Sequence, residues 1–299
     1  MTMNGPGAPG GGAPGDAQRE EPRDDRRERQ ANVPRRWCSP IKERLRRGEP
    51  VFGVTITTTS LDLAARAAAA GFDFMWIEME HSPITLETLR NIVLATRGLP
   101  AAPIARVPVN ELWTAKRVLD QGVHGVVFPF TSNVERARQA VAACRYPPVG
   151  RRGSGNGLAV TCWPDPDAAG YYDSADENVV VVAVVEEASA LEQIDEIAAT
   201  PGLDVVFIGT SDLSFSLGHR GSQEPAAVRD AIERVRKAAE RHGKACGLPV
   251  RSSEQAQAAI AAGFRFFQVN SDLNFFEMGA RQLLEPLGRK PGGGERGLY

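Results

Sequence analysis

The chain is most tightly constrained by a repeat: eight short runs of apolar, largely β-branched residues, each followed by a segment of helical periodicity. The runs are VFGVTI (51–56), FDFMWIEM (72–79), APIARV (102–107), GVVFPF (125–130), VVVVAVVE (179–186), DVVFIG (204–209), KACGLPV (244–250) and FRFFQVN (264–270). Continuous apolar strands that alternate with helices are typical of an α/β protein whose parallel sheet is covered by helices. Eight such units close a barrel, so the sequence predicts a (β/α)8 TIM barrel.

The helical segments begin and end on residues suited to those positions. Asn110 and Asn133 are expected to cap the helices that they open, and Gly71 is a natural helix stop. A further helix, capped by Ser39 with Pro40 in its first turn, precedes the first strand and is expected to cover the barrel floor. An open doubly wound sheet is the alternative, but no G-x-G-x-x-G follows the first strand and there is no Walker sequence.

The two ends of the chain have a different composition from the middle. Residues 1–15 are mostly Gly, Pro and Ala, and residues 16–36 carry six acidic side chains and seven arginines with almost nothing to bury. Such segments do not offset the entropy of ordering themselves, so 1–36 and 288–299 are predicted to be disordered tails. The barrel is then expected to span residues 37–287.

Composition argues against several classes of protein. The 35 Lys and Arg residues nearly balance 37 Asp and Glu residues, which disfavours a dedicated nucleic-acid binder. The longest apolar run is well short of the roughly 20 residues of a membrane-spanning helix, and the first residues contain no apolar signal region. The four cysteines stand far apart without a C-x-x-C, which disfavours a disulfide scaffold or zinc ribbon. We therefore expect a cytoplasmic protein.

In a TIM barrel, the chemistry lies where the strands end, and two acidic residues stand at such ends. Glu186 closes the fifth apolar run and Asp212 follows the sixth. Neighbouring parallel strands lie about 4.8 Å apart, so both carboxylates could reach one ion. Two carboxylates completed by water and substrate oxygens suit Mg²⁺ or Mn²⁺. The alternative from spacing alone is helix capping, and it stays open at this point.

Three further candidates lie at the same edge. His81 could act as a general base near neutral pH, or be an ordinary loop histidine. Arg106 could hold a carboxylate or an enolate oxygen, or form an ion pair with Glu78 or Glu80 of the preceding run. The segment Gly209-Thr210-Ser211 could offer backbone N–H groups to a substrate carboxylate, or form a tight turn. Leu248 lies near the end of the seventh run, which puts it at the same edge. None of the five lysines is placed at this edge to form a Schiff base.

Four segments, taken in order, resemble the HpcH/HpaI aldolase family of metal-dependent class II pyruvate aldolases. They are GFDFMWIEMEHSP (71–83), the stretch from ARVPVNELW to VGRRG (105–153), VEEASALEQIDEIAATPGLDVVFIGTSDLS (185–214) and GKACGLPV (243–250). The likeness covers roughly 39–287. It implies a (β/α)8 barrel and a homo-oligomer, usually a hexamer built through exchanged C-terminal helices.

The resemblance also implies roles for individual residues. Glu186 and Asp212 match the metal ligands, and His81 matches the base. Asp120 matches the acidic partner that orients this base, and Arg106 matches the arginine at the substrate keto and enolate oxygen. The substrate-binding positions are completed by the turn that holds the pyruvate carboxylate, and the full expected set is Arg106, Gly209, Thr210, Ser211 and Leu248.

The chain departs from the family pattern at several positions. Glu78 stands where D-x-E-H usually has Asp, Val184 where Gln is common, and Thr210 within a turn that is often G-P-A-D. The usual Trp after the first strand is replaced in Thr55–Thr58. These changes alter the expected pocket lining, so the sequence leaves the acceptor aldehyde open.

The reaction implied by the resemblance is the cleavage or formation of 4-hydroxy-2-oxo acids from pyruvate and an aldehyde. It would pass through an enolate stabilised by Mg²⁺ or Mn²⁺, with Co²⁺ as a further candidate, and would involve neither nucleic acid nor membrane. One alternative is a lyase of the citrate-lyase-β or malyl-CoA type that acts on a CoA thioester, although no basic groove for the CoA diphosphate is evident. A non-catalytic binding relative is the other, and the intact His81, Arg106, Glu186 and Asp212 argue against it.

Overall fold

The computed structural model describes residues 37–163 and 170–289, and the structural statements below concern those residues. The segments 1–36 and 290–299, which fall in the predicted disordered tails, lie outside the described residues.

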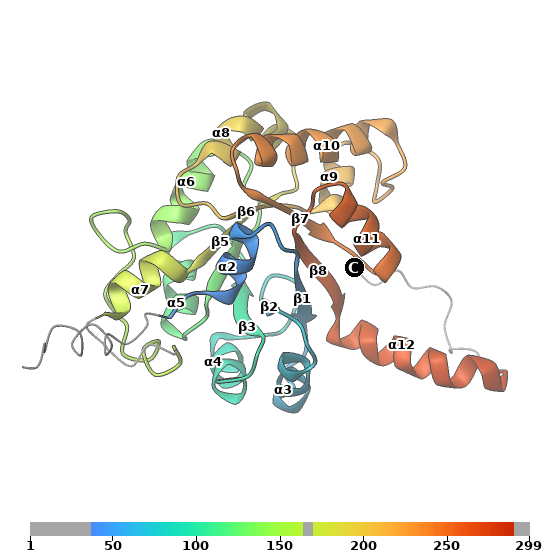
Figure 1. Ribbon diagram of the computed structural model, residues 1–299, viewed down its shortest axis with the longest axis horizontal. Coiled ribbons are helices and arrows are strands. Elements are labelled where there is room, and N and C mark those ends of the chain that lie inside the picture. The colour runs from blue at the N-terminus through green and yellow to red at the C-terminus, as the bar shows by residue number, and fades with distance from the viewer. Residues whose placement is uncertain (1–36, 164–169, 290–299) are drawn as a thin grey trace, which may run out of the picture. The chain divides into compact units, whose positions relative to one another are not determined.

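Eight parallel strands close a barrel in which each strand pairs with its neighbours in sequence, and β8 returns to β1 (Figure 1). The strands are β1 (Val51–Ile56), β2 (Phe74–Glu78), β3 (Ala102–Arg106), β4 (Gly125–Phe128), β5 (Val180–Val185), β6 (Val205–Ile208), β7 (Ala245–Pro249) and β8 (Phe266–Ser271). The predicted (β/α)8 architecture is therefore confirmed. Seven of the predicted apolar runs contain a strand entirely, and β8 extends one residue beyond the eighth run, to Ser271.

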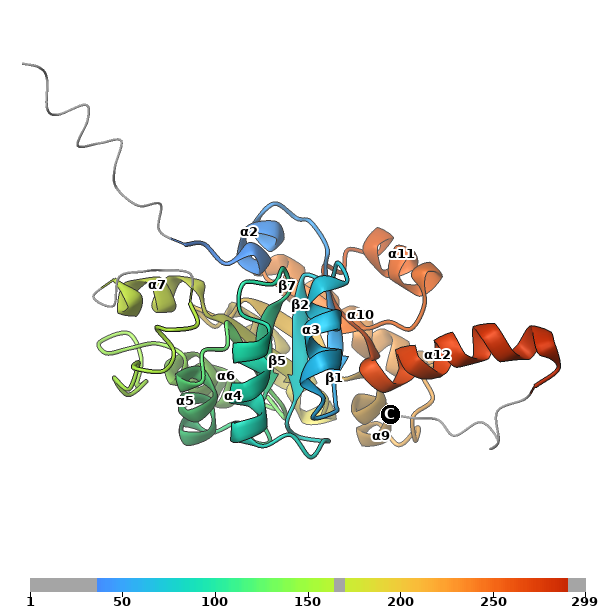
Figure 2. The ribbon, with the colours of Figure 1, turned by 90° about the horizontal axis from the view of Figure 1, so that it is seen from below.

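Helices surround the barrel on its outside, as Figures 1 and 2 show. They are α3 (Leu61–Ala69), α4 (Leu86–Ala95), α5 (Leu112–Asp120), α6 (Val134–Ala143), α7 (Tyr171–Asn178), α8 (Ile194–Ala199), α9 (Thr210–Ser216), α10 (Ala226–Arg241), α11 (Ser253–Ala261) and α12 (Asp272–Leu284), with 3₁₀ turns η1 (Ala188–Gln193) and η2 (Glu285–Leu287). The predicted extra helix is α2 (Pro40–Arg46), which Ser39 caps. Ile41 of α2 packs into the cluster inside the barrel, so α2 closes the barrel floor as expected.

Two hydrophobic layers hold this architecture together. The first fills the barrel interior with side chains such as Phe74, Trp76, Val182, Phe207 and Phe266. The second lies between the strands and the surrounding helices. Because β2, β4, β5 and β6 are buried on both faces, their sequences are almost continuously apolar, as expected for strands of a covered parallel sheet.

Three local predictions need correction. The N-cap of α5 is Glu111 and not Asn110, because the Asn110 side chain instead donates to Thr131 and to the Arg136 carbonyl. The helices α7 and α9 were not predicted. Of the four buried residues of α7, Ser174 and Asn178 are polar, so its apolar periodicity is weak. The short α9 begins where the sequence suggested only a turn.

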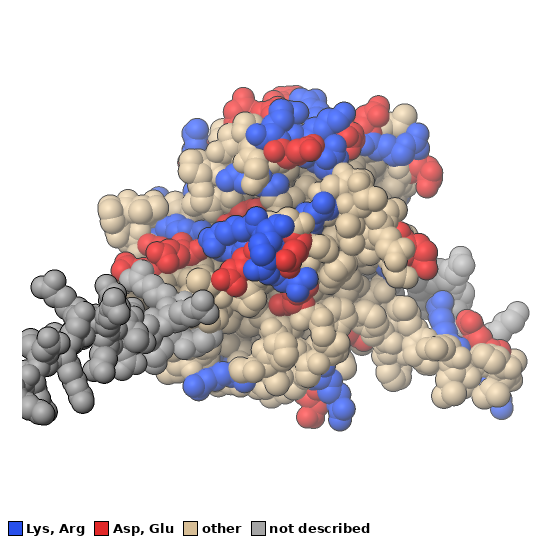
Figure 3. Space-filling model, in the orientation of Figure 1, with Lys and Arg blue, Asp and Glu red and all other residues tan. Residues whose placement is uncertain are grey.

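The last helix, α12, differs from the others in what it exposes. It extends away from the barrel in Figures 1 and 2, and its surface in Figure 3 is largely uncharged. Phe276 is 75% exposed and Leu283 is 68% exposed. By contrast, charges of both signs are interspersed over α10 in Figure 3. None of the described helices is both long and apolar enough to cross a membrane.

Candidate active site

The register of the barrel strands brings a carboxylate and a guanidinium side by side at the carboxyl edge. Glu78 ends β2 and pairs directly with Arg106, which ends β3. Their side chains point along the same edge, with Arg106 Nη1 3.5 Å from Glu78 Oε2. The sequence offered this ion pair as an alternative to a functional role for Arg106, and the structure confirms that the pair forms.

Arg106 is the hub of a larger cluster of carboxylates. Its Nη2 atom lies 2.5 Å from Glu80 Oε2 and 3.3 Å from Glu186 Oε2. The Arg106 side chain is only 12% exposed, and the three carboxylates around it are at least as buried. One guanidinium therefore faces three acids from β2 and β5 in a site with little access for water, where electrostatic interactions are strong.

Glu78 also shapes the turn that carries the histidine. Its Oε1 atom accepts hydrogen bonds from the backbone N–H groups of Glu80 (2.8 Å) and His81 (3.2 Å). Its Oε2 atom accepts one from Trp76 Nε1 at 3.1 Å. Glu78 stands where the family pattern usually has Asp. Its carboxylate lies beneath the turn and holds His81 at the mouth of the barrel.

His81 and Glu80 form the exposed side of the cluster. The His81 side chain is 58% exposed, and its Nε2 atom lies 3.6 Å from Glu80 Oε2. Burial raises the pKa of Glu80 to about 7, against the lowering effect of Arg106. A carboxylate with this pKa, beside an imidazole, can give or take a proton near neutral pH.

Glu186 is the most enclosed acid of the cluster. It follows β5 directly, is 2% exposed, and accepts a hydrogen bond from the Phe130 N–H at 2.6 Å. A Cβ at residue 209 would approach Glu186 Oε2 to 2.8 Å and the Glu186 Cβ to 2.9 Å, so glycine at 209 leaves the room that the Glu186 side chain occupies. Burial raises the pKa of Glu186 to about 7, although Arg106 and the Phe130 N–H lower it.

Asp212 completes the group from the next strand along. It lies exposed in the first turn of α9, and its charge is close enough to raise the pKa of both Glu80 and Glu186. Gly209 is the N-cap of α9, and no side chain caps this helix. The expected substrate positions Gly209, Thr210 and Ser211 therefore form a helix start beside the carboxylates. Thr210 itself is buried, and its Oγ1 atom accepts from Gln223 Nε2 at 2.9 Å.

The carboxylate cluster suits a divalent cation in its chemistry. Three acids, Glu78, Glu80 and Glu186, contact a single arginine, and the charge of a fourth, Asp212, acts on Glu80 and Glu186. Carboxylate oxygens are the ligands that Mg²⁺ and Mn²⁺ prefer. Within the part of the chain that the structure describes, no three His, Cys, Asp or Glu side chains converge as a complete metal site. A cation here would therefore need ligands from water and substrate.

Two expected site residues lie elsewhere. Asp120 ends α5, which runs from the carboxyl edge of β3 back to the amino-terminal edge of β4, so within one chain it does not reach His81. Its Oδ1 atom lies 3.7 Å from Arg152 Nη2 instead. Leu248 on β7 is half-buried and packs against the layer between strands and helices, so it does not join the cluster.

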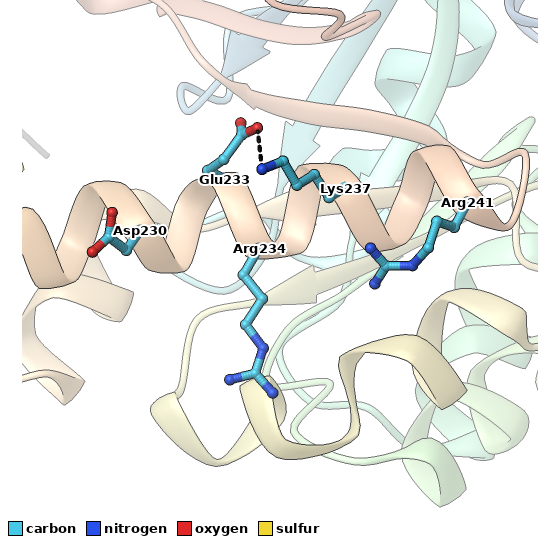
Figure 4. A pocket seen from close by; sticks show the side chains of 5 residues that line it. All are labelled: Asp230, Glu233, Arg234, Lys237 and Arg241. Atoms are coloured by element: carbon cyan, nitrogen blue, oxygen red, sulfur yellow. Dashed lines mark ion pairs between the residues drawn. The ribbon is translucent and has the colours of Figure 1, made fainter.

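A hollow on the outer surface does not belong to this site. It has a volume of about 280 Å³ and lies on α10, where Asp230, Glu233, Arg234, Lys237 and Arg241 line it (Figure 4). Glu233 and Lys237 pair across it at 3.5 Å. All five residues come from one exposed helix face, which is a solvated charged surface and contains none of the expected site residues.

The sequence did not reveal the part played by Phe130. Its φ of +47° places it in the left-handed region, which phenylalanine rarely adopts, and its N–H group is what holds Glu186. No residue type at this position signals such a turn, since neither Gly nor Asn is present. Glu80 was noted only as a possible ion-pair partner, and the structure makes it a central member of the cluster.

An eight-stranded parallel barrel with an acidic cluster and one arginine at its carboxyl edge is the arrangement of a TIM-barrel enzyme. Residues 52–277 match the model of the HpcH/HpaI aldolase/citrate lyase family, and the chain belongs to that family. It is therefore a carbon–carbon lyase by class.

The relatives agree with this assignment. A hydroxypyruvate/pyruvate aldolase of Paraburkholderia phytofirmans is 35% identical over 83% of this chain and 97% of its own length. A 5-keto-4-deoxy-D-glucarate aldolase of Salmonella arizonae is 36% identical over 77% of this chain and 87% of its own. The crystal structure of a family member from Burkholderia cenocepacia covers 84% of this chain and 100% of its own, with 32% identity and a TM-score of 0.77.

Proposed function

We propose that the protein is a class II aldolase that forms or cleaves 4-hydroxy-2-oxo acids, with pyruvate and an aldehyde as partners. The observation that carries the proposal is the buried Glu186, which Phe130 and Arg106 hold beside Asp212 at the carboxyl edge. The names of the aldolase relatives support the same chemistry.

Glu186 and Asp212 would hold the divalent cation, Mg²⁺ or Mn²⁺ with Co²⁺ as a further candidate. When bound, such an ion supplies positive charge that polarises the keto group of a 2-oxo acid. Both residues belong to a cluster with more acids than bases, so a cation would relieve repulsion between carboxylates.

The protein's own groups would divide the remaining work. Arg106 sits between Glu80 and Glu186, where its guanidinium can donate to a substrate oxygen as negative charge develops there. The start of α9 at Gly209, Thr210 and Ser211 can donate backbone N–H hydrogen bonds to the substrate carboxylate. His81, at the exposed mouth, can remove the proton of the 4-hydroxyl in cleavage and return it in condensation.

A metal-dependence assay tests this function directly. The protein is incubated with pyruvate and a panel of aldehydes, with and without EDTA, and the aldol product is quantified. We expect product only in the presence of added Mg²⁺ or Mn²⁺ and its loss with chelator. Turnover confined to CoA thioesters would instead support the citrate-lyase-type alternative. Absence of turnover with every substrate would support a non-catalytic relative.

We also propose that the active site is completed by a second copy of the chain. Asp120 lies at the opposite barrel edge from His81, so the expected pairing of the two residues requires Asp120 of another protomer. The exposed apolar residues of α12, among them Phe276 and Leu283, offer a surface for such an assembly, and a hexamer is the form expected from the family resemblance.

Co-expression of two inactive variants separates this arrangement from a single-chain site. We expect His81→Ala to lower kcat by about 10²–10⁴-fold and Asp120→Asn to lower it by about tenfold or more. Mixed oligomers of the two should regain about a quarter of wild-type activity, because random pairing places an intact His81 beside an intact Asp120 in that share of sites. Mixing His81→Ala with Glu186→Gln is the control, since both changes affect the same chain's site. Equal recovery in the two mixtures would refute the shared site.

A further inference from the structure

Phe130 adopts a backbone conformation that its side chain does not favour. It follows β4 at the carboxyl edge with φ +47°, and it is one of two non-glycine residues with positive φ in the described ranges. The residue is 44% exposed, so little burial compensates for this conformation. Strained residues that persist in this way are concentrated at functional sites, where the surrounding structure holds them.

The conformation has one direct consequence for the site. It turns the Phe130 N–H group toward Glu186 Oε1, and the resulting hydrogen bond is 2.6 Å long. The other oxygen, Oε2, lies 3.3 Å from Arg106 Nη2 and packs against Gly209. One oxygen of the Glu186 carboxylate is thus held by the turn after β4, and the other is contacted by Arg106 at the end of β3 and by Gly209 after β6.

The residues after Phe130 anchor the turn on both sides. The Thr131 N–H group donates to the Val184 carbonyl of β5 at 3.0 Å, and its Oγ1 atom donates to the Phe128 carbonyl at 3.2 Å. Asn110 Nδ2, in the loop between β3 and α5, donates to Thr131 Oγ1 at 3.4 Å. This buried network explains why Asn110 is not a helix cap, and it leaves residue 130 little freedom to relax.

We propose that the left-handed turn at Phe130 is a positioning device for Glu186, in which the backbone N–H of residue 130 sets the carboxylate in the orientation that binds a divalent cation. Phe130 acts through its backbone and not through its ring. The inference rests on the proposed function, in which Glu186 is a cation ligand. Groups that orient a ligand in this way typically change metal affinity 10–100-fold when they are removed.

Mn²⁺ affinity, measured by the EPR signal of unbound Mn²⁺ in titrations of full-length protein without substrate, tests the proposal. Three variants all lack the ring: Phe130→Ala and Phe130→Gly keep the N–H group, whereas Phe130→Pro removes it and holds φ near −65°. We expect Phe130→Pro to weaken Mn²⁺ binding by about 10–100-fold, and the other two to stay within about threefold of wild type. Wild-type affinity in Phe130→Pro, or equal losses in all three, would overturn the proposal.

Two further measurements keep the outcome decisive. If Phe130→Pro does not fold, Thr131→Val takes its place, because it removes the hydroxyl that anchors the turn while keeping the side-chain shape. We expect it to weaken Mn²⁺ binding by about threefold or more, and unchanged affinity would count against the device. The matched control is Thr96→Val, whose buried hydroxyl donates to the Ile92 carbonyl in α4 away from the site. Glu186→Gln separates the two proposals. If this variant binds Mn²⁺ with wild-type affinity, the proposed function fails. If it loses Mn²⁺ binding while Phe130→Pro keeps wild-type affinity, only the positioning role of Phe130 fails.

Discussion

Replacing Glu186 by glutamine is expected to lower metal-dependent kcat/KM by about 10³-fold or more, since several kcal/mol of charge stabilisation depends on the ion. The side chain is 2% exposed and keeps its volume in the variant, so the barrel should fold as before. Asp212→Asn should have a comparable effect from the neighbouring strand end. Steady-state kinetics over a range of Mg²⁺ and Mn²⁺ concentrations measure both.

The controls for this prediction are exposed acids outside the cluster. Glu192→Gln on η1 and Asp230→Asn on α10 remove the same charge from the chain and should leave kcat/KM unchanged. If Glu186→Gln and Asp212→Asn both retained wild-type rates, their assignment as ligands would be refuted.

Substitution of His81 by alanine is the second large effect. A positioned general base contributes about 10²–10⁴-fold, and we expect kcat to fall by that factor while Mn²⁺ affinity is nearly unchanged. His81 is 58% exposed and packs little, so loss of stability does not account for the change. His242→Ala, at the exposed end of α10, is the control. A fall of less than tenfold in His81→Ala would exclude His81 as the base.

The barrel itself could be predicted because its determinants are local. Each strand is a continuous apolar run, and glycines such as Gly71 and Gly122 end the preceding helix in the left-handed conformation. The predicted bounds of β1 agree with the structure at both ends. The helix α7 could not be found in this way, because its determinants are not local. Its buried Asn178 forms hydrogen bonds with the backbone of Ser39 and Trp37, which are far away in sequence.

The candidate site was predictable in part for a similar reason. The rule that strand ends carry the chemistry depends on topology alone, and it selected His81, Arg106, Glu186 and Asp212. What it could not supply is the geometry between neighbouring strands. The N–H of Phe130 holds Glu186 because of a left-handed turn that β3 and β5 enforce.

Asp120 illustrates the opposite case, in which a role implied by resemblance does not fit one chain. Its place at the end of α5 puts it on the far edge of the barrel, beside the buried Arg152. Sequence position gives no information on contacts between copies. The mixed-oligomer experiment is therefore the appropriate test of its role.

Protons should compete with the metal for Glu186, so that Mn²⁺ affinity falls as the pH is lowered. Burial raises the pKa of Glu186 to about 7, and a protonated carboxylate does not ligate a cation. As the pH falls from 8 to 6, Glu186 takes up a proton that the metal must displace. Below pH 7, the apparent Mn²⁺ affinity should therefore weaken by about tenfold for each pH unit. Glu192→Gln, which removes an exposed acid outside the cluster, should keep the same dependence.

The most direct test of the account is a crystal structure of the protein soaked in Mn²⁺, with anomalous data collected to locate the ion. We expect a single strong anomalous peak within coordination distance of both Glu186 and Asp212, next to the Arg106 guanidinium. A peak that contacts neither carboxylate, or no peak at a Mn²⁺ concentration that supports turnover, would contradict the proposed metal site.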